Sequence, residues 1–368
     1  MQQDDEAASL PRQNARHKLT TAHGGLMIYE HALRPLLFCL EPETAHQLAQ
    51  DALSHEWLWR WIGSEPDPRL RTKAGGLDLS SPIGLAAGFD KNGDAVSGLQ
   101  HLGFGYLAIG SIRPEPSVGN PRPRLIRYPE TESLGNCYGL PSAGLDACVT
   151  IFRALAARKP RTKLVANINA ETVEEYVRCV GALAPYVDAF ELALRCPNRS
   201  DHLSVYPPDD LAPLLRAVGE RCPGKPVFVK LPPYFDDVER DNRMELVELA
   251  IKLGLAGVVI PGNWSISEPR LSRGQASLSG RVTFERNLKT VREVASLARG
   301  RIAIKASGGV FTGEEALQLL TAGADMIDVL TAFVYRGWNA AAKINRELAA
   351  LMDRERVTDL RALQPTWA

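Results

Sequence analysis

The sequence lacks several features that would assign it to a large class of proteins at once. Its six cysteines are scattered and form no C-x-x-C pair, which argues against a zinc ribbon, an iron–sulfur ligand set or a disulfide framework and fits a reducing compartment. No apolar stretch reaches the ~18 residues needed to span a bilayer. Lys+Arg and Asp+Glu both total 43, so no excess of positive charge indicates nucleic-acid binding. No G-x-G-x-x-G opens a helix after a strand, so a dinucleotide fold has no support. What remains is a chain of 368 residues that can bury a large core.

The first residues of the chain are expected to form a disordered leader. Residues 1–26 are polar, include Asp4, Asp5 and Glu6, and lack the apolar region of a secretory signal. The early acidic residues also disfavour a transit peptide.

Residues 27–63 predict an amphipathic helical extension ahead of the main domain. Leucines between Leu33 and Leu40 recur at helical spacing, and so do apolar residues between Ala45 and Leu53. Two interpretations of this pair of helices stay open. The helices pack on the domain, or they form a hydrophobic flap on a membrane surface, where tryptophan suits the interface. Three tryptophans follow the second helix: Trp57, Trp59 and Trp61.

Residues 64–368 alternate between short apolar runs and helical patterns. Amphipathic stretches such as 243–253, 284–298 and 314–321 separate the later runs, and Thr312-Gly313-Glu314-Glu315 predicts a capping box. Eight strands separated by helices favour an α/β fold of the (β/α)8 TIM barrel type over a doubly wound sheet. The predicted strands are Pro82–Ala87, Tyr106–Gly110, Lys163–Ile168, Ala189–Leu194, Pro226–Leu231, Gly257–Pro261, Ile302–Ala306 and Met326–Leu330.

In such a barrel the functional residues lie at the carboxyl ends of the strands, and these ends are polar here. The fourth predicted strand stops at Arg195-Cys196-Pro197-Asn198-Arg199. A thiol between cations is a candidate base or nucleophile, because positive charge favours the thiolate; a small buried cysteine before a turn is the alternative. Gly308-Gly309 after the seventh strand is typical of a phosphate cradle. Together these ends predict a phosphorylated cofactor and a small substrate.

Several segments, in their order along the chain, resemble the signature segments of one enzyme family. They are similar to those of the dihydroorotate dehydrogenases, with the best fit to the quinone-linked class 2 group, and the similarity runs from about Met27 to the C-terminal region. The segments are Ala86-Ala87-Gly88-Phe89-Asp90-Lys91, Gly119-Asn120-Pro121-Arg122-Pro123-Arg124, Cys196-Pro197-Asn198, Val229-Lys230, Leu278-Ser279-Gly280-Arg281 and Gly308-Gly309.

The resemblance implies FMN as the cofactor and no metal. Asn167 and Lys230 would reach the isoalloxazine ring, where Lys230 would stabilise negative charge on the reduced ring. The phosphate would lie near the glycines and the end of the eighth strand. The cofactor-binding residues implied by motif match are Ala86, Ala87, Gly88, Ser111, Asn167, Lys230, Gly280, Gly308, Gly309, Leu330 and Thr331.

The resemblance also implies the reaction and its catalytic residues. The family removes a proton and a hydride from adjacent carbons, and a base on the loop after the fourth strand takes the proton. Class 2 members use serine there and class 1 members use cysteine, so Cys196 resembles a class 1 base in a class 2 frame. A free thiol, with a pKa of ~8.5, ionises far more easily than serine. Lys91 would lie between flavin and substrate, and Lys230 would complete the catalytic set.

The electron acceptor and the cellular place are expected from the same resemblance. The N-terminal helices match those that form a hydrophobic passage for quinone in class 2, and His46 and Arg127 fall on positions that line the passage. The expected acceptor is a quinone or oxygen. We expect a cytoplasmic protein that contacts the inner membrane peripherally.

The segments on the substrate side depart from the family pattern. The usual Asn-Arg-x-Gly-Phe-Asn is Asn136-Cys137-Tyr138-Gly139-Leu140-Pro141, and the usual Thr-Asn-Thr-Thr is Gly262-Asn263-Trp264-Ser265. Of four asparagines that would grip orotate, one is replaced by Ala193. The expected substrate-contacting residues are Lys91, Asn136, Tyr138, Gly139, Leu140, Arg195, Asn198, Arg199, Asn263 and Trp264.

Because the flavin half is preserved and the substrate half is rewritten, we interpret the chain as an FMN-dependent oxidoreductase repurposed from dihydroorotate. Its substrate would be small and polar, with an acidic group for Lys91, Arg195 or Arg199, and the bond oxidised would be C–C or C–N beside a carbonyl. The alternative is a genuine quinone-linked dihydroorotate dehydrogenase of pyrimidine biosynthesis. A lesser alternative is a flavin-binding protein without turnover.

Overall fold

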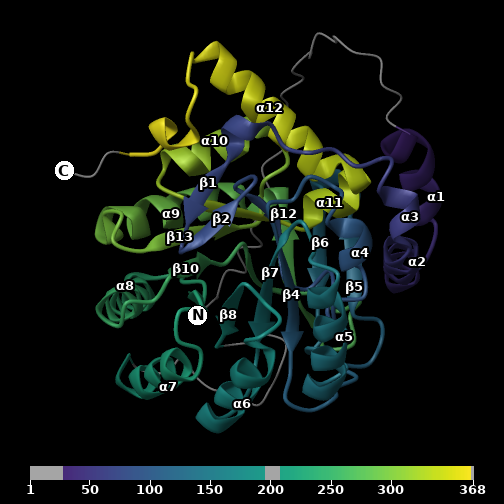
Figure 1. Ribbon diagram of the computed structural model, residues 1–368. Coiled ribbons are helices and arrows are strands. Elements are labelled where there is room, and N and C mark those ends of the chain that lie inside the picture. The colour runs from purple at the N-terminus through teal and green to yellow at the C-terminus, as the bar shows by residue number, and fades with distance from the viewer. Residues whose placement is uncertain (1–27, 195–207, 366–368) are drawn as a thin grey trace, which may run out of the picture.

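The computed structural model describes residues 28–194 and 208–365. Eight parallel strands close into a barrel in the order β10-β13-β14-β3-β4-β7-β8-β9. Each strand lies where the sequence pattern predicts one, so the predicted (β/α)8 barrel is confirmed (Figure 1). The barrel strands are β3 (Ile83–Leu85), β4 (Tyr106–Ile112), β7 (Lys163–Ile168), β8 (Ala189–Ala193), β9 (Val227–Lys230), β10 (Gly257–Ile260), β13 (Ala303–Ser307) and β14 (Met326–Val329).

Amphipathic helices cover the outside of the barrel (Figure 1). The predicted capping box is confirmed: the Thr312 hydroxyl accepts from the Glu315 amide, and the Glu315 carboxylate accepts from the Thr312 amide. Such a box satisfies amide groups that the first helical turn leaves unbonded. The helices of the barrel are α4 (Val96–Leu99), α5 (Leu145–Ala157), α6 (Val173–Leu183), α7 (Pro208–Arg221), α8 (Asp237–Lys252), α9 (Phe284–Ala298), α10 (Gly313–Thr321), α11 (Thr331–Arg336) and α12 (Ala340–Arg354), with 3₁₀ turns η2 (Pro68–Leu70), η3 (Pro129–Thr131), η4 (Arg281–Thr283), η5 (Gly337–Asn339) and η6 (Leu360–Leu363).

A short hairpin closes one end of the barrel. Its strands are β1 (Thr72–Ala74) and β2 (Leu77–Leu79), which pair antiparallel. Ala74 and Leu77 share an apolar cluster with Tyr106 and Phe228, whose side chains lie inside the barrel. The amino-terminal end of the barrel is therefore filled by apolar side chains.

A second sheet lies at the opposite end, and the sequence pattern did not predict it. It is antiparallel, in the order β11-β12-β6-β5, and joins segments far apart in the chain. Its strands are short and contain several polar residues, so they lack the apolar alternation that indicates a strand. They are β5 (Leu125–Tyr128), β6 (Ser133–Asn136), β11 (Asn263–Ser267) and β12 (Gln275–Gly280).

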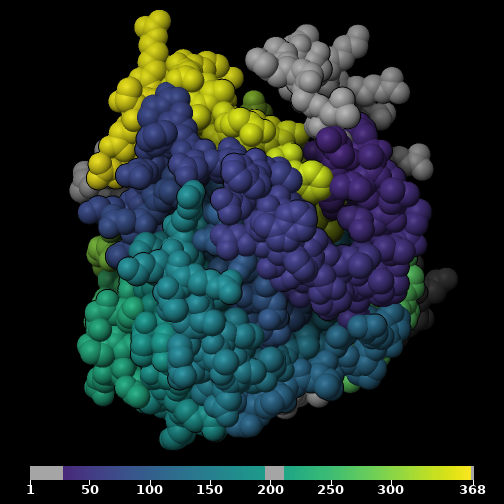
Figure 2. All heavy atoms as spheres, turned by 45° about the vertical axis from the view of Figure 1, so that its right-hand side comes forward, coloured from purple at the N-terminus to yellow at the C-terminus, as the bar shows by residue number. Residues whose placement is uncertain are grey.

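The N-terminal extension packs against one side of the barrel, beside the C-terminal helices (Figure 2). It holds the two predicted helices, α1 (Arg34–Phe38) and α2 (Pro42–Ser54), with a π-helical turn η1 (Tyr29–Leu33) before them and a short α3 (Glu56–Trp59) after them. Tyr29 donates to the Val334 carbonyl at 2.6 Å. Of the three tryptophans, Trp59 packs against Trp338, whereas Trp57 and Trp61 are 66% and 80% exposed. No helix in the described part of the chain is long and apolar enough to cross a membrane.

The space around a glycine predicts whether the protein tolerates its replacement by alanine. A Cβ on Gly84 would overlap the buried ring of Tyr106. We expect Gly84→Ala to lower the free energy of unfolding by about 1–3 kcal/mol, as overpacking does. The matched control is Gly219→Ala in α7, where no atom lies within 4 Å of an added Cβ. We expect Gly219→Ala to leave the free energy of unfolding unchanged or to raise it by about 0.5–1 kcal/mol. Urea denaturation of both variants measures the difference, and equal midpoints would contradict the prediction.

Candidate active site at the carboxyl ends of the strands

A cavity of about 460 Å³ lies where the barrel strands end. All eight strands contribute residues to its lining, within the last residues of the strand or just after it. The antiparallel sheet forms part of the opposite wall through residues such as Asn136, Asn263 and Ser277. The barrel therefore gathers residues from His46 to Val334 around one cavity.

Nearly all of the residues predicted to bind the cofactor line this cavity. Gly280 and Gly309 do not, and their packing explains the glycines: an added Cβ would lie 2.6 Å from Ser133 Cα or 2.6 Å from Phe284 Cα, respectively. The predicted residues in the lining are Ala86, Ala87, Gly88, Ser111, Asn167, Lys230, Gly308, Leu330 and Thr331.

The cavity offers groups that suit a flavin. Asn167 is buried, and within the described residues its Oδ1 has no hydrogen-bond partner. A buried acceptor without a partner is costly, so a ligand with an N–H group would relieve it. Lys230 presents a cation to the cavity with 26% of its side chain exposed. Gly88 leaves room, because a Cβ there would meet no atom closer than Leu330 Cδ1, at 3.7 Å.

One residue beneath the cavity lining was missed by sequence analysis. Glu191 lies on β8 next to Asn167 in register and is fully buried. Its Oε1 accepts from Asn167 Nδ2 at 2.8 Å and lies 3.6 Å from Lys230 Nζ. The signal was present in the sequence as an acidic residue inside an otherwise apolar strand, Ala189-Phe190-Glu191-Leu192-Ala193.

The predicted substrate side also lies on the cavity. Lys91, Asn136, Tyr138, Gly139, Leu140, Asn263 and Trp264 line it. Ser277, which sequence analysis also missed, holds two of them: its carbonyl accepts from Asn136 Nδ2 at 3.3 Å, and its hydroxyl accepts from Asn263 Nδ2 at 2.6 Å. Ala193, at the end of β8, leaves no amide donor at its position. The remaining predicted residues, Arg195, Cys196, Asn198 and Arg199, lie outside the described residues.

Lys91 lies against an aromatic ring. Its Nζ is 4.5 Å from the centre of the Tyr138 ring, and Arg124 lies over the same ring at 5.2 Å. Burial lowers the pKa of Lys91 to about 8, and the attraction of Asp90 opposes this. A cation in so dry a place gains from an anionic ligand.

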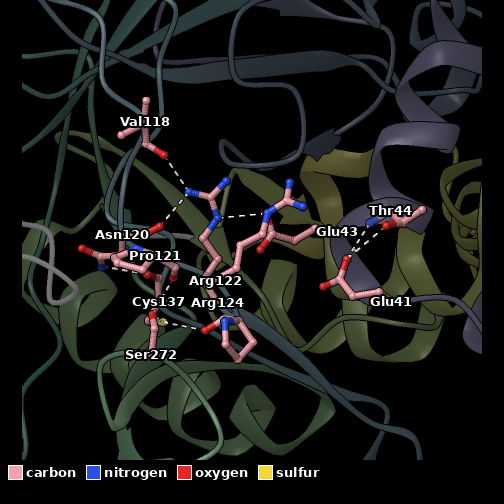
Figure 3. A network of polar contacts seen from close by, with 11 residues as sticks. Glu41, Glu43, Thr44, Val118, Asn120, Pro121, Arg122, Arg124, Cys137 and Ser272 are labelled. Carbon is pink, nitrogen blue, oxygen red and sulfur yellow. Dashed lines mark hydrogen bonds and ion pairs between the residues drawn. The ribbon is translucent and has the colours of Figure 1, made fainter.

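A polar network ties the N-terminal extension to the cavity rim (Figure 3). The carboxylate of Glu43, buried on α2, accepts from Arg124 Nε at 2.9 Å and lies 3.3 Å from Arg122 Nε. Arg124 also donates to the carbonyls of Val118 and Asn120, at 2.7 and 3.1 Å. The segment Gly119–Arg124 thus links α2 to the wall that carries Tyr138 and Lys91.

The two residues predicted for a quinone passage lie in different places. His46 lines the cavity, with its ring 4.9 Å from that of Phe89. Arg127 does not belong to the lining: its guanidinium lies 4.5 Å over the Phe38 ring, and Nη1 donates to the Leu40 carbonyl at 3.0 Å. Arg127 therefore fastens the turn between α1 and α2 to β5.

Comparisons with known proteins agree with this geometry. The model of the dihydroorotate dehydrogenase family matches residues 69–352. A protein of Anaeromyxobacter sp. (strain K) named dihydroorotate dehydrogenase (quinone) is 36% identical over 89% of this chain and 94% of its own length. The mitochondrial dihydroorotate dehydrogenase (quinone) of Mus musculus is 33% identical over 90% of this chain and 88% of its own. The crystal structure of DHODH from Eimeria tenella with ferulenol superposes with a TM-score of 0.80 at 25% identity, covering 90% of this chain and 98% of that chain.

The environment of His46 predicts a pH dependence of stability. Burial lowers its pKa from 6.5 to about 3, whereas in the unfolded chain it titrates near 6.5. The unfolded state therefore binds the extra proton below pH 6.5, so stability falls as the pH drops. We expect wild type to lose about 1.4 kcal/mol more than His46→Gln between pH 7.5 and 5.5. Denaturation curves at both values test this, and a pH-independent difference between the two proteins would contradict it.

Proposed function

The chain belongs to the dihydroorotate dehydrogenase family, and from this premise we propose that it is an FMN-dependent enzyme that oxidises dihydroorotate to orotate and passes the electrons to a quinone. It is an oxidoreductase of the kind that acts on CH–CH bonds. The observation that carries the proposal is the cavity itself, to which all eight strands contribute. It holds the basic side chain of Lys230 and a buried amide oxygen, Asn167 Oδ1, that has no partner among the described residues.

FMN fits the donor set on the cavity floor. Asn167 Oδ1 would accept from the flavin ring, and Lys230 would lie beside the part of the ring that gains negative charge. The backbone at Gly308 and Thr331 would surround the phosphate. When bound, the cofactor supplies a two-electron acceptor that takes a hydride from the substrate.

The chain's own residues would bind the substrate and move a proton. Lys91 would hold the substrate carboxylate, and Asn136 and Asn263, held by Ser277, would bind its ring. Cys196 would take the proton from the carbon next to the one that loses the hydride. β8 ends at Ala193, which lines the cavity together with Leu194, two residues ahead of Cys196 in the sequence.

Quinone access would lie on the side of the N-terminal extension. His46 on α2 lines the cavity, so this helix reaches the proposed flavin site. The same extension exposes large apolar side chains to the outside, which supports peripheral membrane contact. These are Leu36, Trp57, Trp61 and Ile62, which are 67%, 66%, 80% and 53% exposed.

A second candidate is a related small acidic substrate in place of dihydroorotate. Ala193 supports it, because a polar ring that loses one donor is left with an unpaired group at a cost of about 1–3 kcal/mol. Trp264 supports it further, since its large ring occupies the cavity wall next to Asn263. Both candidates share the cofactor, the base and the direction of electron flow.

Anaerobic mixing with dihydroorotate tests the proposal. We expect the yellow holoprotein to bleach within seconds, and a ubiquinone analogue to restore the colour faster than oxygen does. Cys196→Ala should slow bleaching by about 10²–10⁴-fold, because the proton loses its acceptor. Bleaching by another acidic metabolite and not by dihydroorotate would favour the second candidate. A protein that binds FMN and is bleached by neither would be a flavin-binding protein without turnover.

Substrate affinity should depend on the charge of Lys91. Because its pKa lies at about 8, the cation is lost as the pH rises above that value. We expect the dissociation constant of orotate for the oxidised holoprotein to rise about tenfold per pH unit above pH 8. Lys91→Met should bind weakly at every pH and lose this slope. Calorimetric titrations between pH 6.5 and 9.5 measure both curves, and parallel curves would contradict the assignment.

A further inference from the structure

Four charged side chains meet inside the barrel, beneath the cavity. They are Lys230 on β9, Glu191 on the adjoining β8, Lys305 on β13 and Asp328 on the adjoining β14. Strand β10 separates these two pairs of strands in the barrel. We call these four residues the barrel-core charges. Apolar branched side chains usually fill the interior of such a barrel, so a group of ions there calls for a separate explanation.

The barrel-core charges form a chain of contacts that begins at the cavity. Lys230 Nζ lies 3.6 Å from Glu191 Oε1. Glu191 Oε2 accepts from Lys305 Nζ at 2.7 Å, and Lys305 Nζ lies 3.2 Å from Asp328 Oδ1. Tyr106 ends the chain by donating to the same oxygen at 2.8 Å. Cations and carboxyl groups alternate along it.

The chain opens toward the cavity at one end. Its far end is Tyr106, which packs with Phe228 and the β1–β2 hairpin in the cluster that closes the barrel. Lys230 has 26% of its side chain exposed, whereas each of the other three is 1% exposed. Within the described residues, the barrel-core charges therefore reach the cavity through Lys230.

Glu191 stays ionised although it is fully buried. Burial alone would raise its pKa, but the two lysines beside it, Lys305 above all, hold the pKa at about 2. Burial raises the pKa of Asp328, against the attraction of Lys305. A permanent negative charge thus lies next to Lys230, in an interior that salt screens poorly.

Glu191 also fixes the neighbour of Lys230. Its Oε1 accepts from Asn167 Nδ2, and the amide oxygen of Asn167 is left without a partner among the described residues at the cavity. One carboxylate therefore holds both side chains that are proposed to reach the flavin ring.

We propose that Glu191, anchored by Lys305, is a positioning residue that sets the charge which Lys230 presents to the flavin, and thereby the reduction potential of the cofactor. The inference rests on the proposed function, which places FMN above Lys230. Substrate oxidation delivers two electrons and a proton as hydride and leaves one negative charge on the reduced cofactor. A cation beside that charge favours reduction, and an anion held against the cation offsets part of the effect.

A purely structural role explains the barrel-core charges less well. Removing ions from water is costly, and buried ion pairs are often no more stabilising than apolar residues of the same volume. Because cations and carboxyl groups alternate, each ion has a partner of opposite charge. This pairing does not explain why the barrel interior contains ions in place of apolar side chains. Contact with Lys230 gives that reason.

The test is the two-electron midpoint potential of the bound FMN, measured against reference dyes. We expect Glu191→Gln to raise the equilibrium constant for reduction of the bound FMN by about tenfold or more. For a two-electron couple, a tenfold change corresponds to a midpoint potential about 30 mV more positive. Asp328→Asn is the matched control, because it removes a carboxyl from the same chain at the far side of Lys305. We expect Asp328→Asn to shift the midpoint potential by less than Glu191→Gln does.

A second variant separates charge from folding. If Glu191→Gln does not fold, the double variant Glu191→Gln, Lys305→Met removes both members of the inner pair and keeps the net charge. It should shift the potential in the same direction by a smaller amount. A folded, yellow variant with the wild-type potential would overturn the inference and leave the proposed function standing. Wild-type protein that binds no FMN would instead overturn the proposed function, and the inference with it.

Discussion

Closure of a parallel sheet into a barrel is the constraint on which the rest of this molecule depends. Because every strand runs in the same direction, all eight carboxyl ends meet at one end of the barrel. Residues from Ala86 to Thr331 thus line a single cavity although most of the chain separates them. The amino-terminal end is filled by the β1–β2 hairpin, so the chemistry has one end of the barrel available to it.

Two additions turn this general scaffold into a particular site. The antiparallel sheet β11-β12-β6-β5 walls the cavity opposite the strand ends, and through Ser277 it orients Asn136 and Asn263. The N-terminal extension covers one side, where Glu43 pairs with Arg124 and His46 reaches the lining. In the proposed function, the barrel strand ends would contact the flavin, the antiparallel sheet would contact the substrate, and the N-terminal extension would contact the quinone.

The two halves of the site differ in how closely they follow their family. The proposed flavin half keeps nearly every expected residue, and the substrate half departs from the pattern at Ala193 and Trp264. Relatives named dihydroorotate dehydrogenase (quinone) at 33–36% identity favour the original substrate over a repurposed one. On the proposed flavin side, the barrel-core charges place the carboxylate of Glu191 behind Lys230.

The sequence by itself determined the barrel, its eight strands, the capping box at Thr312 and most of the cavity lining, because apolar periodicity, capping and ordered motifs are local signals. It also predicted the two helices of the N-terminal extension. Only the tertiary structure decided which residues meet: the antiparallel sheet, the hold of Ser277 on two asparagines, the place of Arg127 beneath the α1–α2 turn, and the pairing of Glu191 with Lys230 and Lys305. These features are contacts between segments distant in the chain, and no local pattern encodes which partner a buried charge will find when the strands close around it.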